Sequence, residues 1–179
     1  MIYISFHDLC SMTFQIANTN TTMEKRTNIG LQREESRQIA EKLNELLANY
    51  HLYYQNLRGF HWNIKGIHFF QLHAKFEELY TVALTKIDAI AERILTIGQQ
   101  PLHTLSDYVR VSRIHEAGDL GGDKETVMVT HQNLSTLLDL EREILQMASR
   151  AGDEGTVSLI SDDINQNEKT LWMLNAFLS

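Results

Sequence analysis

Long runs of apolar residues at steps of three and four are the feature that most restricts what this chain can form. In the first run, Ile39, Leu43, Leu46, Tyr50 and Leu57 follow the helical repeat, which is typical of a helix with one apolar face. The 179 residues include only one proline and 9 glycines, so few positions force the backbone to break. The pattern predicts four long helices, over about residues 36–61, 68–97, 124–150 and 157–178.

The connections between these helices predict how they are arranged. Gly66 lies in a short turn between the first two helices, and residues 152–155 form another between the last two, so each pair is expected to be antiparallel. Residues 98–122 hold Pro101 and a single helical candidate, Leu105 to Val111. A connection of this length can run along the whole bundle and make the second and third helices parallel. The prediction is an all-α, ferritin-like four-helix bundle with one long crossover that carries a short extra helix.

The sequence ahead of the first helix lacks this periodicity. Residues 1–30 are therefore expected to form a flexible N-terminal tail, and residues 31–178 a single folded domain. Met1, Met12 and Met23 all lie in this tail, and the sequence does not distinguish which of them starts translation.

Composition excludes several classes of protein. The single cysteine, Cys10, leaves no disulfide framework within one chain and no cysteine-rich zinc site. No stretch approaches the roughly 20 apolar residues of a membrane helix, and residues 1–12 lack the basic start of a secretory signal. We therefore expect a cytoplasmic protein with no membrane partner. The formal net charge of −7 disfavours nucleic acid as a partner and favours cations.

Four possible metal ligands follow one face of the second predicted helix. Relative to His73, three acidic residues lie about 40°, 60° and 100° around the helix axis: Glu77, Asp88 and Glu92. The stripe is also long, because His73 and Asp88 stand roughly 22 Å apart along the axis. One ion cannot contact both ends, so each half of the helix offers only two ligands.

A second copy of the helix would complete both halves. An antiparallel partner, related by a twofold axis near the mean position of the four residues, places the His73 half of one chain opposite the Asp88 half of the other. Val82 and Ala83 are expected at this axis, where the small Ala83 side chain allows close approach. The short turn brings His61 back beside the second helix as a further donor. Imidazoles with carboxylates suit iron(II), manganese or zinc, and the carboxylates favour redox-active iron over structural zinc.

The ordinary interpretation of such a stripe is a solvated polar face. Two features favour a metal site instead. Buried carboxylates need a compensating cation, which a metal supplies. Aromatic residues also crowd the same region, with too much apolar area to leave in water: Phe60, Trp62, Phe69, Phe70, Phe76 and Tyr80.

The segment 56–101 combines three motifs: His-Trp-Asn at 61–63, Leu-His at 72–73 and Asp-x-Ile-Ala-Glu-Arg at 88–93. It resembles the signature region of the Dps family, the miniferritins known as DNA-binding proteins from starved cells, and the likeness covers about residues 31–178. The resemblance implies a hollow shell of twelve subunits with ferroxidase centres at twofold interfaces. Family members oxidise iron(II) there, preferably with hydrogen peroxide, and store a ferric mineral inside, which protects against oxidative stress.

Carried over by position, the resemblance implies a metal site shared by two chains. Glu77 occupies a place where several family members have aspartate, which puts its binding mode and the affinity for a second iron in doubt. Trp62, beside the first ligand, resembles a family tryptophan that takes up stray oxidising equivalents, although plain packing explains it equally well. The implied ligands are His61, His73 and Glu77 from one subunit, and Asp88 and Glu92 from its mate.

Three acidic residues near the start of the fourth helix, Asp153, Glu154 and Asp162, resemble the region that lines the family's threefold pore. Acidic residues in a first turn also complement the helix dipole, which is the alternative explanation. Arg93 is expected to form an ion pair rather than to react.

Other functions compete with iron oxidation. The family members that coat DNA use a lysine-rich tail, whereas in residues 1–30 Lys25 and Arg26 merely balance Asp8 and Glu24, so DNA binding is not expected. No glutamate is followed by a histidine three positions on, so the di-iron site that ordinary ferritins build within one bundle is absent from the sequence. A structural shell with weak oxidation activity, a DNA-compacting protein, and manganese or zinc as the bound metal remain alternatives.

Overall fold

The computed structural model describes residues 25–179, and these form helices joined by turns and one long connection. The described chain is all-α, as predicted, and each long helix begins and ends within three residues of its predicted bounds. Residues 1–24 of the expected tail lie outside the described residues. The helices are α2 (Arg33–Asn63), α3 (Phe69–Thr96), α4 (Leu105–Val111), α5 (Asp123–Ala151) and α6 (Glu154–Leu178).

The last residues of the expected tail form a closed turn. The Thr27 amide donates to the Leu31 carbonyl at 2.8 Å, and the Arg33 amide donates to the Lys25 carbonyl at 2.9 Å. Thr27 is only 8% exposed and lies beside Gly98 at the end of α3. Residues 25–30 therefore fold against the helices, ahead of the predicted boundary at residue 31.

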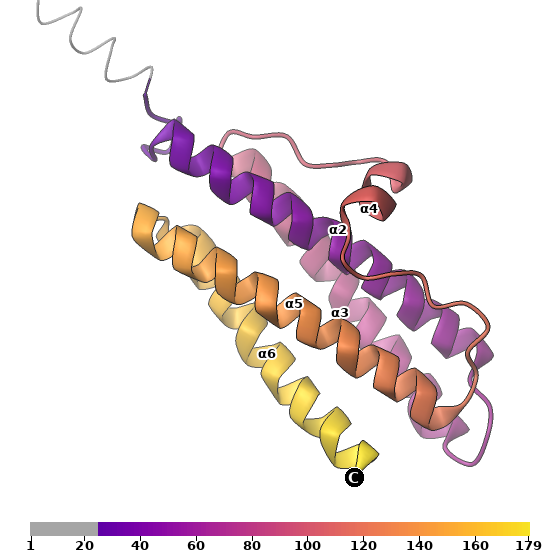
Figure 1. The fold of residues 1–179 in the computed structure, drawn as a ribbon. Helices are drawn as coiled ribbons and strands as arrows, with labels where there is room; N and C mark the ends of the chain where they lie inside the picture. The colour runs from indigo at the N-terminus through magenta and orange to yellow at the C-terminus, as the bar shows by residue number, and fades with distance from the viewer. Residues whose placement is uncertain (1–24) are drawn as a thin grey trace, which may run out of the picture.

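The four long helices form a bundle in which α2 pairs with α3 and α5 pairs with α6 (Figure 1). Contacts at both ends fix their directions. At one end His68, just before α3, donates from Nδ1 to the Asp123 carboxylate at the start of α5, at 2.7 Å. At the other end Arg93 of α3 pairs with Asp153, at the start of α6. The second and third long helices are therefore parallel, as the long connection predicted.

A tight turn between α5 and α6 brings the apolar side chains of both helices into the interior. Gly152 ends α5 in the left-handed conformation, with φ of +67°, and Asp153 then caps α6 by accepting from the Thr156 amide at 3.1 Å. This tight turn folds α6 back onto α5, so both apolar faces reach the same core. The largest fully buried side chains are Tyr50, Phe60, Phe76, Ile39, Leu43, Leu46, Leu47, Leu57, Ile90, Ile94, Ile97 and Leu134.

The crossover runs back along α2 and carries α4 on the way (Figure 1). Polar residues of α2 hold it in place. Asn49, which is fully buried, accepts through Oδ1 from the Ser112 hydroxyl and from the Arg113 and Ile114 amides, at 3.0–3.1 Å. Arg113 donates to Glu45 at 2.6 Å. The connection is therefore anchored to the bundle by side-chain hydrogen bonds and by Tyr108 and Ile114, which are buried in the core.

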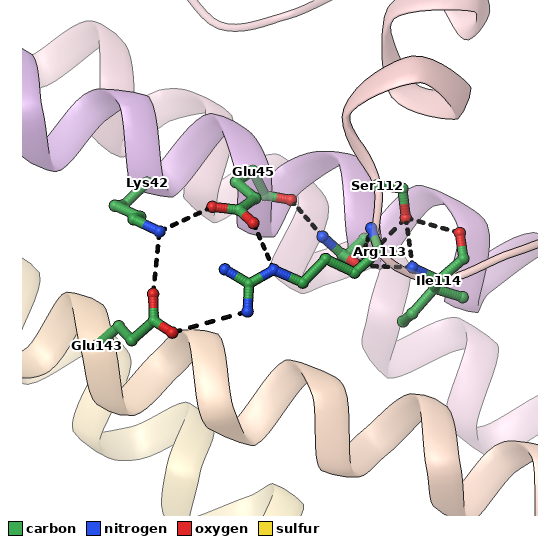
Figure 2. A network of polar contacts seen from close by, with 7 residues as sticks. Lys42, Glu45, Ser112, Arg113, Ile114 and Glu143 are labelled. Atoms are coloured by element: carbon green, nitrogen blue, oxygen red, sulfur yellow. Dashed lines mark hydrogen bonds and ion pairs between the residues drawn. The ribbon is translucent and has the colours of Figure 1, made fainter.

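One ion-pair network continues from the crossover to α5. Lys42 of α2 binds both Glu45 on its own helix and Glu143 on α5, each at 3.0 Å, and Arg113 approaches Glu143 at 3.6 Å (Figure 2). These groups are partly exposed, so the network orients α2, α5 and the crossover more than it stabilises them. In residues 25–179, no helix is both long and apolar enough to cross a membrane.

Candidate metal centre

Two histidines from different helices stack where α2 ends and α3 begins. The rings of His61 and His73 lie with centroids 3.8 Å apart and planes 20° apart. The turn of residues 64–68 reverses the chain here, which places the last turn of α2 against the first turns of α3. The structure thus brings together two of the predicted ligands that lie 12 positions apart in sequence.

Each histidine is oriented by the backbone of the other. His61 Nδ1 lies 2.8 Å from the His73 carbonyl oxygen, and His73 Nδ1 lies 2.8 Å from the His61 carbonyl oxygen. A carbonyl only accepts, so each Nδ1 carries its proton and donates. In the neutral ring the lone pair therefore resides on Nε2, and no hydrogen bond within residues 25–179 engages either Nε2 atom. A backbone carbonyl that fixes the tautomer in this way is a common support for a metal-binding histidine.

Glu77 follows His73 by one helical turn and is exposed. Between it and the histidines lies Tyr80, whose ring meets His61 edge-on at 5.5 Å and Tyr54 edge-on at 6.0 Å. Desolvation, together with the nearby Glu77 carboxylate, raises the pKa of the Tyr80 phenol. Glu77 thus lies on the same face of α3 as His73, with Tyr80 nearby, but it does not gather with the two imidazoles into a ligand group within the described residues.

The other half of the predicted ligand set lies farther along the same helix. Asp88 and Glu92 are both exposed on α3. Within the described residues no group of three or more histidine, cysteine, aspartate or glutamate side chains gathers closely enough to hold a metal ion. One chain therefore presents two separate half-sites, and whether a second chain joins them stays a prediction.

The prediction that Val82 and Ala83 lie at the twofold axis is wrong for Ala83. Ala83 is only 1% exposed and packs in the core of its own bundle, and Val82 lines a cavity between α3 and α6. The reason is the 100° step of the helix, which turns both residues about 130° away from the centre of the ligand face. Thr81 and Leu84 lie on that face instead, and Leu84 is 53% exposed. A partner helix would therefore meet Leu84, not Ala83.

Trp62 lies at the surface, 58% exposed, next to His61. The guanidinium carbon of Arg58 lies 4.7 Å from the Trp62 ring centre and 5.3 Å from the Tyr54 ring centre. Plain core packing therefore does not describe Trp62 within one chain, because most of its surface is open and its described contact is a cation–π pair.

The three acidic residues compared with a pore differ in their surroundings. Asp153 is 2% exposed, pairs with Arg93 and accepts from the Thr156 hydroxyl at 2.6 Å. Its carboxylate caps α6 and is fully engaged, and the expected ion pair of Arg93 is confirmed. Glu154 and Asp162 are exposed, so only these two carboxylates are open to solvent.

A second polar cluster, which the sequence analysis did not identify, lies inside the bundle. It brings Lys86 of α3 and Glu141 of α5 together with polar residues of α2 and α6, and Glu141 is fully buried. Burial raises the pKa of the Glu141 carboxyl to about 7. Charged residues at core positions of the apolar pattern, such as Glu141 between Leu137 and Ile144, were the available signal.

Comparisons with known proteins identify relatives of this chain. A family model of the ferritin-like domain matches residues 40–179. The DNA protection during starvation protein of Porphyromonas gingivalis is 39% identical over 148 residues, covering 83% of this chain and 93% of that protein. DNA protection during starvation protein 2 of Bacillus anthracis is 40% identical over 147 residues, covering 80% of this chain and 99% of that protein.

A solved structure extends the likeness to three dimensions. The crystal structure of a Dps protein from Vibrio cholerae superposes with a TM-score of 0.85 at 46% identity, covering 87% of this chain and 98% of that chain. That protein is described as a member of a broad superfamily of ferritin-like diiron-carboxylate proteins. Sequence and fold agree, and the chain belongs to the Dps family of ferritin-like proteins.

Proposed function

We propose that this protein is a ferroxidase and iron store that oxidises iron(II), preferably with hydrogen peroxide, at sites completed by two subunits. In this proposal twelve chains form a hollow shell, and the ferric product is deposited inside it as a mineral. The protein would thereby remove both reactants that generate hydroxyl radicals. The observation that supports it best is the His61–His73 pair, whose backbone hydrogen bonds leave both Nε2 atoms unengaged.

The donor set fits iron(II). His61, His73 and Glu77 supply two imidazole nitrogens and a carboxylate from one chain, and the exposed Asp88 and Glu92 of a second chain would add two more carboxylates. Mixed nitrogen and carboxylate donors suit iron(II) and stabilise iron(III) as charge increases. Because no complete ligand group exists within the described part of one chain, the proposed centre requires a neighbour.

The proposed reaction is balanced without a further reductant. Two iron(II) ions each lose one electron, hydrogen peroxide accepts both, its O–O bond breaks, and two protons complete two molecules of water. Hydroxyl radical escapes only when peroxide receives a single electron. Trp62 is proposed to supply the second electron in such cases, because it follows His61 directly in sequence and its side chain is 58% exposed.

Iron must also reach the interior of the shell. We propose that the exposed Glu154 and Asp162 contribute to an acidic path, since carboxylates that are open to solvent attract cations. Asp153 is excluded from this role, because its carboxylate is buried against Arg93 and Thr156.

Mixed assemblies test whether two chains share the centre. His73→Ala and Glu92→Gln subunits are purified separately, unfolded, mixed in equal amounts and refolded together. Each mixed pair contains one centre with both defects and one intact centre, so random pairing restores about a quarter of the wild-type sites. Peroxide-dependent iron(II) oxidation should therefore reach about a quarter of the wild-type rate, whereas neither variant alone is active. If the centre belonged to one chain, mixing would restore nothing.

The stoichiometry tests the reaction itself. Wild-type protein should consume about one peroxide for each two iron(II) ions, the ratio that two-electron reduction requires, and it should suppress spin-trapped hydroxyl radicals relative to iron and peroxide alone. A one-to-one ratio with strong radical signals would contradict the proposal. Failure to load iron in the presence of peroxide would favour the alternative of a structural shell with little activity.

DNA binding is the second function that the relatives' names bring up, because they are named for the protection of DNA. The net charge of −7 on each chain repels phosphate, and an assembly multiplies that charge. We propose that protection here comes from the removal of iron and peroxide. A gel-shift assay at physiological salt should show no complex, and a clear shift at that salt would overturn this view.

A further inference from the structure

The buried polar cluster takes one or more side chains from every long helix. Tyr50 comes from α2, Lys86 from α3, Glu141 from α5, and Asp163 and Asn167 from α6. All five residues are 6% exposed or less. Polar side chains that project inward from four facing helices are the arrangement that bundle proteins use to hold metal ions.

The contacts within this cluster centre on two groups. Glu141 Oε1 accepts from the Tyr50 hydroxyl at 2.6 Å and from Asn167 Nδ2 at 2.7 Å. Lys86 Nζ donates to Asn167 Oδ1 at 3.1 Å and pairs with Asp163 Oδ1 at 3.1 Å. Asn167 thus joins the Glu141 carboxylate to the Lys86 ammonium.

The charges of the cluster are not fully balanced. Two carboxyl groups, Glu141 and Asp163, share one ammonium, that of Lys86. Glu141 Oε2 and Asp163 Oδ2 are both buried without a hydrogen-bond partner. Unpartnered carboxylate oxygens in an interior are costly, and a cation is the group that relieves them. Burial raises the pKa of both carboxyls, in agreement with this deficit of positive charge.

A cavity connects the cluster to the surface between α3 and α6. It has a volume of about 200 Å³, and Tyr50, Lys86 and Asn167 line it together with surface residues such as Lys169. The cavity reaches Lys86 and Asn167, whereas the Glu141 and Asp163 carboxylates do not line it.

We propose that the Lys86 ammonium occupies the position that a metal ion would take beside Glu141 and Asp163. It thereby excludes divalent cations from the interior of the bundle. Without this ammonium, Glu141 and Asp163 would bind one divalent cation per chain, with the Asn167 amide oxygen as a further ligand. Lys86 is thus a specificity-determining residue that confines metal to the outer face of α3. The binding of iron at the outer face rests on the proposed function, whereas the exclusion of divalent cations from the interior does not.

Cobalt(II) binding tests this proposal separately from the ferroxidase centre. The comparison uses His73→Ala protein with and without the additional change Lys86→Ala, so that the outer half-site is already impaired in both. Titration followed by visible absorption and calorimetry should show one extra cobalt(II) per chain in the protein that lacks Lys86. Equal binding by the two proteins would overturn the proposal, whatever the wild-type protein does with iron.

Two further variants locate the extra ion. Glu141→Gln, added to the same protein, should weaken the extra site at least about tenfold, because it removes a charged ligand. Lys169→Ala in place of Lys86→Ala should add no site, since Lys169 lines the same cavity but forms no ion pair in residues 25–179. An extra site that survives Glu141→Gln unchanged, or one that Lys169→Ala also creates, would contradict the assignment.

The variant without Lys86 is expected to be less stable, because it leaves Asp163 unpaired. If it does not fold in metal-free buffer, refolding with excess cobalt(II) should restore the helical circular dichroism, since the ion replaces the ammonium. Failure of cobalt(II) to restore folding counts against the proposal as well.

Discussion

The charged residues on the two sides of helix α3 differ in their exposure and in whether they form an ion pair. On the outer side His73, Glu77, Asp88 and Glu92 are exposed or half-buried and gather into no complete site within the described residues. On the inner side Lys86 is 6% exposed and meets the carboxylate of Asp163 at 3.1 Å. A carboxylate that has a protein cation beside it serves the fold, whereas carboxylates left without one are available to bind a metal.

This comparison predicts that substitutions on the inner side of α3 change the unfolding free energy. Substitutions on the outer side are expected to change the rate of iron(II) oxidation instead. The largest effect is expected for Asp163→Ala, which removes the carboxylate that pairs directly with the buried Lys86 ammonium. Removal of one partner of a buried ion pair costs about 3–5 kcal/mol of unfolding free energy. Guanidinium unfolding at fixed protein concentration measures it. Asp162→Ala, at the exposed neighbouring position, should change stability by less than about 0.5 kcal/mol, and equal losses in both variants would break the comparison.

The buried Glu141 carboxyl in the inner cluster should make the stability of the protein depend on pH. The pKa of Glu141 is about 7 in the folded protein against an ordinary 4.5, so the folded state holds the proton more tightly than the unfolded state. This stabilisation is complete below about pH 4.5 and is lost as pH rises through 7, an effect of about 2–3 kcal/mol. The groups that interact with Glu141 are Tyr50, Tyr53, Lys86, Asp163 and Asn167.

Glu141→Gln provides the check on this pH dependence. The variant keeps a hydrogen-bonding side chain of the same size but has no proton to lose, so its unfolding free energy should vary less between pH 5 and 8 than that of the wild type. Unfolding curves recorded across that range measure the difference. Identical pH profiles for the two proteins would show that Glu141 is not the titrating group.

On the outer side, His73→Ala should lower peroxide-dependent iron(II) oxidation by at least about 10–100-fold, because it removes an imidazole ligand and the hydrogen bond to the His61 carbonyl. Initial rates under anaerobic addition of peroxide measure the loss. His103→Ala is the matched control, since His103 is exposed in the crossover and distant in sequence from the proposed ligands. A similar loss in the control would remove the basis for assigning the centre to α3.

The smallest effect is expected for Glu77→Asp. The shorter side chain retains the carboxylate, so oxidation should remain within about tenfold of the wild-type rate, whereas Glu77→Gln should lose more because the charge is gone. Iron(II) titration monitored by calorimetry would show whether the number of ions bound per chain changes. If Gln is tolerated as well as Asp, Glu77 is not a ligand.

Much of the fold was predictable because the bundle depends on local patterns. The steps of three and four in α2, α3, α5 and α6 and the long gap around Pro101 were sufficient for element bounds and topology. The His61–His73 encounter also followed from the short turn after α2. Their reciprocal hydrogen bonds did not, because tautomer and ring orientation depend on backbone positions that only the folded chain fixes.

The inner cluster was harder to predict for a related reason. Asn167 stands in the sequence between the apolar residues Ile164 and Leu171 at helical spacing, but its partners lie on three other helices. Pairing Lys86 with Asp163, 77 positions away, requires the crossing geometry of the bundle. The prediction for Ala83 was wrong because the mean position of the four ligands along the helix does not determine which residues face the same side of it.

The anchoring of the crossover has a consequence for how such a chain can diversify. Asn49 and Asn56 of α2 hold residues 112–117, and the Lys65 amide donates to the Gly121 carbonyl at 2.9 Å just beyond the histidine pair. A Cβ atom at Gly121 would lie 2.9 Å from the Asn63 carbonyl oxygen. Any side chain at position 121 would therefore push against the end of α2, two residues after His61.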